Sequence, residues 1–355
     1  MQPPAGEEEI YRLPDDIFLL ILSHFSTDIK SLARCSVVSS RFRFLVSLVP
    51  SLLIHVNQIF SFHSEILPSI IHLLVSEISL QPMTYHSRYS PHPPRSIIHR
   101  VPIDYLLKKF SNLRSLHIDL SSGEINLDRC TSTNSSPTLF HWHAHFGSSL
   151  NRCLIIGASS FSWIGNEETD VADYDHWAYK DIAVLWANVA LIAASSRHHR
   201  LQRTVKEHAN IESLVVTDAD GQGVFRMDRD QLKELRKGPV LASSANERTI
   251  LRQRWGWMGQ FKLFSGKERT MVPPTRRWEW FAPMVKLSCG QVLKGVTLSA
   301  VLPSSGGEKG EDETGLGWIN EEFDGMYAEV VRLMLKRSPD RHYETETGYE
   351  TKTGY

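Results

Sequence analysis

The segment from Leu13 to Phe25 constrains the fold of this chain most, because its pattern predicts a helix that is apolar on most of its circumference. Pro14 suits the first turn of a helix, where its missing N–H has no partner. The apolar side chains follow two stripes: Ile17, Leu20 and Ile21 form the first, and Phe18, Leu22 and Phe25 form the second. One stripe can pack inside the chain, so the other needs a cover, either from elsewhere in the chain or from a partner.

Two shorter helices are predicted directly after this one. Ser26 or Thr27 can cap a second helix, with Asp28 in its first turn, and a third helix begins near Ser39. Their apolar positions at helical spacing are Ile29, Leu32, Ala33 and Val37, and then Phe42, Leu45 and Val49. Three short helices in about 40 residues form only a small core, which strengthens the need for an external cover.

In order and spacing, this segment resembles an F-box. The family pattern is Leu-Pro-x-acidic-aliphatic, then an Ile-Leu pair, a Leu before a short polar–apolar run, and finally Val-Ser-x-basic-Trp. The chain carries Leu13-Pro14, Ile21-Leu22, Leu32, Val38-Ser39 and, where Trp is most usual, Phe42. Phenylalanine keeps approximately the apolar volume of tryptophan but lacks the indole N–H donor.

The resemblance implies that residues 10–50 dock onto a Skp-type adaptor, and through it onto the cullin and RING subunits of a ubiquitin ligase. It also implies that the rest of the chain binds an unknown target protein for ubiquitination, as a non-catalytic subunit. The residues that fall where the family contacts its adaptor, or supports that surface, are Leu13, Pro14, Ile17, Ile21, Leu22, Leu32, Val38 and Phe42. Two alternatives stay open: an adaptor-binding scaffold without a role in degradation, and a self-contained enzyme with an unrecognised site.

Helical and strand-like patterns alternate beyond residue 100, which predicts an α/β layer arrangement. We therefore expect an α+β / α/β chain, in which a three-helix F-box precedes an irregular, leucine-rich-repeat-like α/β domain. The expected divisions are a disordered leader at 1–9, the F-box at 10–50, the α/β domain at 51–335 with loops near 81–100 and 303–315, and a disordered tail at 336–355.

The leucine-rich interpretation depends on four segments that begin at Leu113, Leu150, Ile211 and Leu293. The first, Leu113-x-x-Leu116-x-Ile118-x-Leu120, matches the strand part of a leucine-rich repeat, and the others match less well. Their spacing is too uneven for a regular array, so four unrelated amphipathic strands remain the alternative. The segments 280–284, 286–288 and 293–298 also resemble, more loosely, a plant group of F-box proteins.

Arg252 to Phe281 is basic and aromatic, and it is the first candidate for a surface that binds the target. The candidate residues are Trp255, Trp257, Arg276, Arg277, Trp278 and Trp280. Tryptophan and arginine dominate many protein interfaces, and aromatic rings among cations also stack on bases. A core of tryptophans surrounded by arginine stems is the other interpretation, and we expect no nucleic acid to bind.

Other clusters of polar residues do not match a familiar metal site or catalytic site. His141, His143 and His145 fall on one face if their segment is a strand, but no carboxylate or cysteine is near at a familiar metal-site spacing. Asp218 to Gly223 lacks the spaced acids of a calcium loop and is interpreted as a turn between a strand and a helix. We expect no bound metal, no cofactor and no catalytic residue, since none of the familiar catalytic motifs occurs.

Composition limits the possible partners and the cellular location. The formal net charge of −1 gives no overall attraction to nucleic acid or to an anionic membrane. The four cysteines form no C-x-x-C pair, which favours a reducing interior. The longest apolar run, Ile182 to Ala194, is too short to span a bilayer, so we expect no membrane role. Nucleus and cytoplasm are both allowed.

Overall fold

The computed structural model describes residues 13–56, 106–120, 139–163, 176–218, 221–238, 275–303, 313–337 and 341–344. The predicted leader at 1–9 and the predicted loop near 81–100 lie outside the described residues. Of the loop predicted at 303–315, Pro303 ends a strand and Glu313 begins a 3-10 helix, and residues 304–312 lie outside the described residues.

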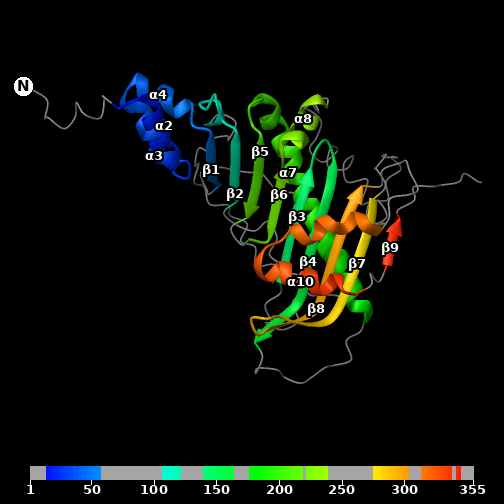
Figure 1. Cartoon of the computed structure of the whole chain (residues 1–355). Helices are drawn as coiled ribbons and strands as arrows, with labels where there is room; N and C mark the ends of the chain where they lie inside the picture. Colours follow the sequence, from blue (N-terminus) through cyan, green and yellow to red (C-terminus); the bar gives the residue numbers. More distant parts are fainter. Residues whose placement is uncertain are drawn as a thin grey trace, which may run out of the picture.

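Three helices form the N-terminal part, as predicted: α2 (Asp15–His24), α3 (Ile29–Val38) and α4 (Ser40–Ser47) (Figure 1). Asp28, rather than Ser26 or Thr27, caps α3, since its carboxylate accepts the backbone N–H of Ser31 at 3.1 Å. The hydroxyl of Ser39 caps α4 by accepting the N–H of Phe42 at 3.2 Å.

Beyond these helices, the described residues form a nine-stranded mixed sheet in the order β1-β2-β5-β6-β3-β4-β8-β7-β9. Figure 1 shows the three helices beyond its β1 edge. The strands are β1 (Ser51–Val56), β2 (Ser115–Leu120), β3 (Leu139–Phe146), β4 (Leu150–Trp163), β5 (Ser213–Asp218), β6 (Gly223–Met227), β7 (Thr275–Lys286), β8 (Gln291–Pro303) and β9 (Arg341–Glu344). The accompanying helices are α7 (His176–Glu207), α8 (Arg229–Lys237), η4 (Glu313–Glu321) and α10 (Gly325–Leu335).

Two hydrophobic cores lie on opposite faces of the sheet. Along β4, Cys153 and Ile155 belong to the core that α7 covers, while Leu154 and Ile156 belong to the core that η4 and α10 cover. This alternation follows from the two-residue period of a strand. Gly157 permits the close approach of α7, because a Cβ added there would lie 1.9 Å from the Trp186 ring.

The leucine-rich-like pattern corresponds to parallel strands in only part of the sheet. Strands β1, β2 and β5 are parallel neighbours in register, so Leu52, Leu116 and Leu214 stand side by side. Strands β4 and β8, which carry the segments beginning at Leu150 and Leu293, instead pair antiparallel with each other. A stacked repeat array would keep all four segments parallel, and the observed sheet is mixed.

Two details of the chain differ from expectation. The predicted disordered tail must be corrected at Arg341–Glu344, because these residues form β9 on the backbone edge that β7 offers. The turn after Asp218 joins strand β5 to strand β6, not a strand to a helix, and the Asp218 carboxylate accepts the Gln222 N–H at 2.7 Å. Within the described residues, no helix is both long enough and apolar enough to cross a membrane.

Candidate protein-docking surface

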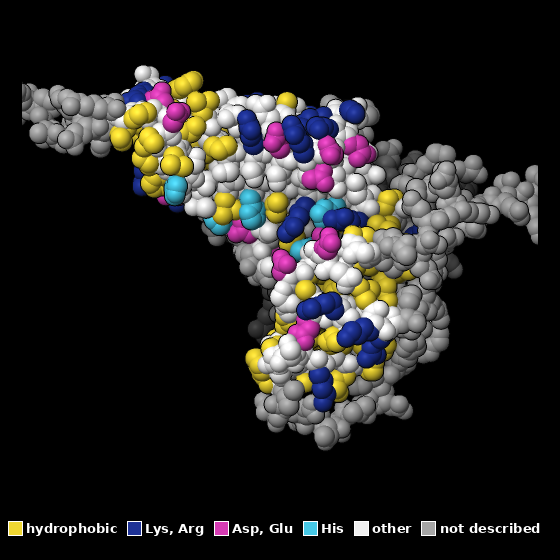
Figure 2. All heavy atoms as spheres, in the orientation of Figure 1, with side chains coloured by type: hydrophobic (Ala, Val, Ile, Leu, Met, Phe, Trp, Pro, Cys, Tyr) yellow, Lys and Arg dark blue, Asp and Glu magenta, His cyan; other side chains and the backbone are white. Residues whose placement is uncertain are grey.

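Large apolar side chains are exposed on the three N-terminal helices. Of the exposed large hydrophobic residues in the described structure, all except Trp163 lie between residues 13 and 44. They are Leu13, Ile17, Leu20, Ile21, Phe25, Val37, Val38 and Phe44, and we call them the helical apolar surface. Figure 2 shows hydrophobic side chains gathered over these helices. A contiguous exposed apolar patch of this kind marks an interaction site.

Buried side chains beneath this surface fix its shape. Phe18 and Leu22 of α2 join Leu32 of α3 and Leu45 of α4 in the hydrophobic core. The ring of Phe42 meets the ring of Phe18 edge to face, with centroids 5.1 Å apart. The helical apolar surface is therefore supported by a hydrophobic core that the three helices form with one another and with the rest of the chain.

Arg41 holds the start of α2 against α4. Its guanidinium pairs with the Asp15 carboxylate at 2.7 Å and donates to the Leu13 carbonyl oxygen at 2.6 Å. The same guanidinium lies 5.0 Å from the centre of the Phe18 ring. These contacts give a physical reason for a basic residue at this position, since it fixes the Leu-Pro segment that begins the helix.

The helices are joined to the sheet through backbone hydrogen bonds and a shared core. The Leu53 N–H donates to the Ser26 carbonyl at 2.9 Å, and the Ser111 N–H donates to the Ser47 carbonyl at 2.8 Å. Val49 of the helical part and Leu116 of β2 belong to one continuous hydrophobic cluster. The helical apolar surface is thus positioned rigidly relative to the sheet.

A family model for F-box-like domains matches residues 10–54, which include all three helices. The chain is also similar along its length to F-box protein At4g18380 of Arabidopsis thaliana, at 32% identity over 94% of this chain and 93% of that protein. The chain belongs to the F-box protein family. Similar relatives of this F-box protein include F-box protein At1g30200, at 31% identity over 92% of this chain and 90% of that protein, and F-box protein AUF2, at 31% over 91% and 95%, both from Arabidopsis thaliana. No solved structure matches the chain.

The residues assigned to adaptor binding from the F-box pattern divide into two groups. Leu13, Pro14, Ile17, Ile21 and Val38 are exposed. The others lie beneath them: Leu22 and Leu32 are buried, and Phe42 is half-buried. The second group is therefore placed to support the surface.

Sequence reasoning did not assign Leu20, Phe25, Val37 and Phe44, although all four are exposed. A signal was present for Leu20, which shares its helical stripe with Ile17 and Ile21. The family pattern alone does not show which stripe faces outward.

Four of the six residues proposed for target binding lie on β7 within the described residues, and these four do not form one exposed surface. Trp255 and Trp257 lie outside the described residues. On β7, Trp280 is buried and Trp278 is half-buried against the core that α10 covers. Arg277 points toward α7, where it donates to the Ala183 carbonyl oxygen at 3.3 Å and pairs with Glu279. The core interpretation therefore fits Trp280, and the half-buried Arg276 stands opposite Glu344 of β9.

The three histidines of β3 share one face, as expected, and meet Glu322 and α10. His145 Nε2 lies 2.6 Å and His143 Nδ1 lies 3.4 Å from Glu322 Oε1. Arg152 approaches the other oxygen, Glu322 Oε2, at 3.2 Å. His141 stacks on the Tyr327 ring with centroids 4.3 Å apart. The described part of the chain contains no group of three or more His, Cys, Asp or Glu residues that could hold a metal ion.

Burial controls the protonation of this cluster. It lowers the pKa of His141 to about 4, and the neighbouring His143 adds to the effect. It also lowers the pKa of His143, against the opposing pull of Glu322. Burial alone would raise the pKa of Glu322, but the nearby His143, the hydrogen bond with His145 and the charge of Arg152 outweigh it, so this pKa is lowered. The cluster therefore joins η4 and α10 to the sheet through an ionised carboxylate.

Proposed function

We propose that this F-box protein is the substrate-recognition subunit of a Skp–cullin–F-box ubiquitin ligase complex. The observation that carries the proposal is the helical apolar surface, which is exposed in the isolated chain and lies within the matched F-box. A Skp-type adaptor supplies the external cover that this surface needs, and it brings the cullin and RING subunits with it. The target-binding part is the mixed sheet with its helices.

The rigid junction between helices and sheet supports this role. The Arg114 N–H donates to the Pro50 carbonyl at 2.8 Å, directly beside the end of α4. A target held by the sheet would then stand at a fixed distance from the adaptor. Such a subunit accelerates the reaction by proximity, since it raises the local concentration of the reacting groups and does no chemistry itself.

Protein lifetimes in cells test the recognition role. We compare cells expressing the wild-type chain with cells expressing Leu20→Ser/Ile21→Ser, which alters two exposed residues of α2. We expect proteins that bind both chains to be short-lived with the wild type and to accumulate with the variant, because the variant binds the target without the ligase. Trp163→Ser, which alters an exposed apolar residue outside the helices, is the matched control and should behave like the wild type.

Unchanged lifetimes of every bound protein, with the adaptor still bound, would support the scaffold alternative and overturn the proposal. Both the nucleus and the cytoplasm are proposed as locations, and tagging the chain with a fluorescent protein would test them in the same cells.

A further inference from the structure

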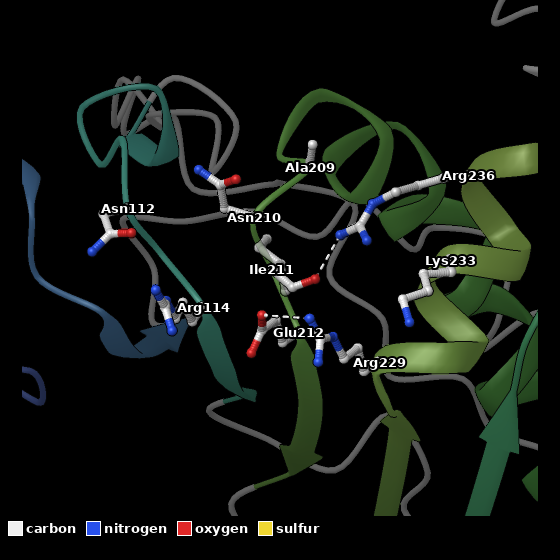
Figure 3. Close-up of a pocket in the computed structure, with 9 residues that line it drawn as sticks. All are labelled: Asn112, Arg114, Ala209, Asn210, Ile211, Glu212, Arg229, Lys233 and Arg236. Atoms are coloured by element: carbon white, nitrogen blue, oxygen red, sulfur yellow. Dashed lines mark hydrogen bonds and ion pairs between the residues drawn. The ribbon is translucent and has the colours of Figure 1, made fainter.

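A polar pocket of about 270 Å³ lies where the segments leading into β2 and β5 meet α8 (Figure 3). The charged side chains that line it are Arg114, Glu212, Arg229, Lys233 and Arg236. Cations therefore outnumber carboxylates in its walls. Figure 2 shows Lys and Arg side chains gathered near the strand ends at this side of the molecule, with acidic side chains among them.

The walls of the pocket are held in place without any ligand. Arg236 is half-buried and donates to the carbonyl oxygens of His208 at 3.1 Å and Ile211 at 2.6 Å, so it fixes α8 against the segment that follows α7. On the other side, the Asn210 amide donates to the Ser111 carbonyl at 2.8 Å. Arg236 thus belongs to the scaffold, and the remaining cations are available for recognition.

Those cations make only weak interactions within the chain. Arg114 is exposed, and within the described residues its guanidinium makes no hydrogen bond or ion pair. Arg229 pairs with Glu212 at 3.5 Å, and Lys233 pairs with Asp230 at 3.0 Å. These pairs are exposed, and exposed ion pairs contribute little to stability, so an incoming anion can replace them.

Figure 3 shows Arg114 and Arg229 on either side of Glu212, with Lys233 further along α8. Two guanidinium groups and an ammonium group therefore line one opening, Arg114 from the residue before β2 and the other two from α8. Guanidinium groups match the oxygens of carboxylates and phosphates with paired N–H donors. The small volume and polar walls do not suit a drug-sized apolar ligand, which needs about 300–1,000 Å³ of mainly hydrophobic lining.

We propose that this pocket binds a side-chain oxyanion, phosphate or carboxylate, on a peptide segment of the target. Arginine clusters recognise acidic and phosphorylated motifs in this way. The assignment of the peptide to a target rests on the proposed function. The position fits it, because Asn112 in the pocket wall donates to the Leu48 carbonyl at 3.4 Å, at the end of α4. A segment bound here would sit beside the junction with the F-box.

Peptide binding by the full chain tests the proposal. Three fluorescent pools of degenerate peptides carry a fixed central phosphoserine, glutamate or serine, and fluorescence anisotropy measures their binding at low and raised salt. We expect the phosphoserine or the glutamate pool to bind more tightly than the serine pool, and we expect salt to weaken that binding. Comparison of the phosphoserine and glutamate pools shows whether the pocket prefers phosphate or carboxylate. If it prefers phosphate, inorganic phosphate should compete with the peptides.

The variant Arg114→Gln/Lys233→Gln should weaken this binding by about tenfold or more, because two charge-assisted contacts are lost. Both residues are exposed, so the fold should be unaffected, and thermal unfolding checks this. Arg332→Gln/Lys336→Gln removes the same charge from exposed positions at α10 and is the matched control. Equal binding of the three pools, or equal weakening in the control, would overturn the proposal.

The two proposals fail independently. The pocket variant should bind the Skp-type adaptor as the wild type does, and Leu20→Ser/Ile21→Ser should bind the peptide pools as the wild type does. Loss of adaptor binding in the pocket variant would show that the pocket belongs to the docking interface, which also overturns its assignment to a target peptide.

Discussion

At the scale of single residues, Glu322 stands out because a buried carboxylate is costly unless it is paired. Its side chain meets His143 and His145 from β3 and Arg152 from β4. These four residues come from β3, from β4 and from the segment between η4 and α10, and their charges compensate one another. Removal of one partner leaves the others unsatisfied. This makes the cluster sensitive to substitution.

Glu322→Gln should lower the free energy of unfolding by about 1–3 kcal/mol, because Arg152 and His145 lose a charged acceptor in a buried setting. Urea unfolding followed by tryptophan fluorescence measures the change. Glu321→Gln alters the exposed neighbour and should leave the unfolding midpoint where it is. Equal effects of the two substitutions would show that the ion pairs do not stabilise the fold.

His141 makes stability depend on pH. Its pKa is lowered from 6.5 to about 4 in the folded chain, so between these values the unfolded chain binds more protons than the folded one. Burial of neutral His141 therefore leaves the free energy of unfolding undiminished above pH 6.5. As the pH drops toward about 4 and below, protonation of His141 in the unfolded chain lowers this free energy by up to roughly 3 kcal/mol in total. Glu322, whose pKa is also lowered, adds a loss in the same direction below its ordinary value of 4.5.

Urea midpoints measured at neutral pH and at pH near 5 should show this loss. His141→Gln should flatten the pH dependence, whereas the exposed His24→Gln should keep it. An unchanged or steeper pH dependence in His141→Gln would contradict the assignment.

At the scale of elements, α7 packs against β4 where a tryptophan ring meets a glycine. Gly157 faces the Trp186 ring, and an added Cβ would meet Cε3 of that ring at 1.9 Å. Gly157→Ala should therefore lower the free energy of unfolding by about 1–3 kcal/mol through overpacking. Gly317→Ala, where an added Cβ meets nothing within 4 Å, should have little effect, and thermal unfolding compares the two.

Local sequence patterns predict elements well here when the information lies within the element. The apolar stripes of 10–50 predict three helices, and the alternation of 138–145 predicts the strand observed as β3, with its histidines on one face. The contact between His145 and Glu322 joins residues 177 positions apart, and the pairing of β9 with β7 also joins segments that are not neighbours in the sequence. Such pairings depend on tertiary packing, and the periodicity of a single segment carries no information about which distant segment it will contact.

The candidate docking site was predictable in part for the same reason. The F-box pattern indicates which positions matter, but Leu22 and Leu32 prove to be buried while Leu20 and Val37 are exposed. Only the packing of α2 on α3 and α4 decides which stripe faces outward. The basic pocket joins Arg114 to α8 from segments far apart in the chain, and no local pattern marks it.

At the scale of the whole molecule, the F-box and the sheet share one hydrophobic cluster, so they should unfold together. Leu32→Ala in α3 should lower the free energy of unfolding by about 2–5 kcal/mol. All nine tryptophans lie beyond the F-box, yet their fluorescence midpoint should shift with the helical signal. A tryptophan midpoint that stays fixed while helicity is lost at lower denaturant would show two independent units.

The helical apolar surface is the basis of the whole account, and its affinity for a purified Skp-type adaptor is the most direct test. Isothermal titration calorimetry on the full chain compares the wild type with Ile17→Ser/Ile21→Ser and with Trp163→Ser. We expect the wild type and Trp163→Ser to bind alike, and Ile17→Ser/Ile21→Ser to bind at least about tenfold more weakly while keeping its unfolding midpoint, since it loses apolar contacts only in the complex. Absence of binding by the folded wild type, or unchanged binding by Ile17→Ser/Ile21→Ser, would contradict the account.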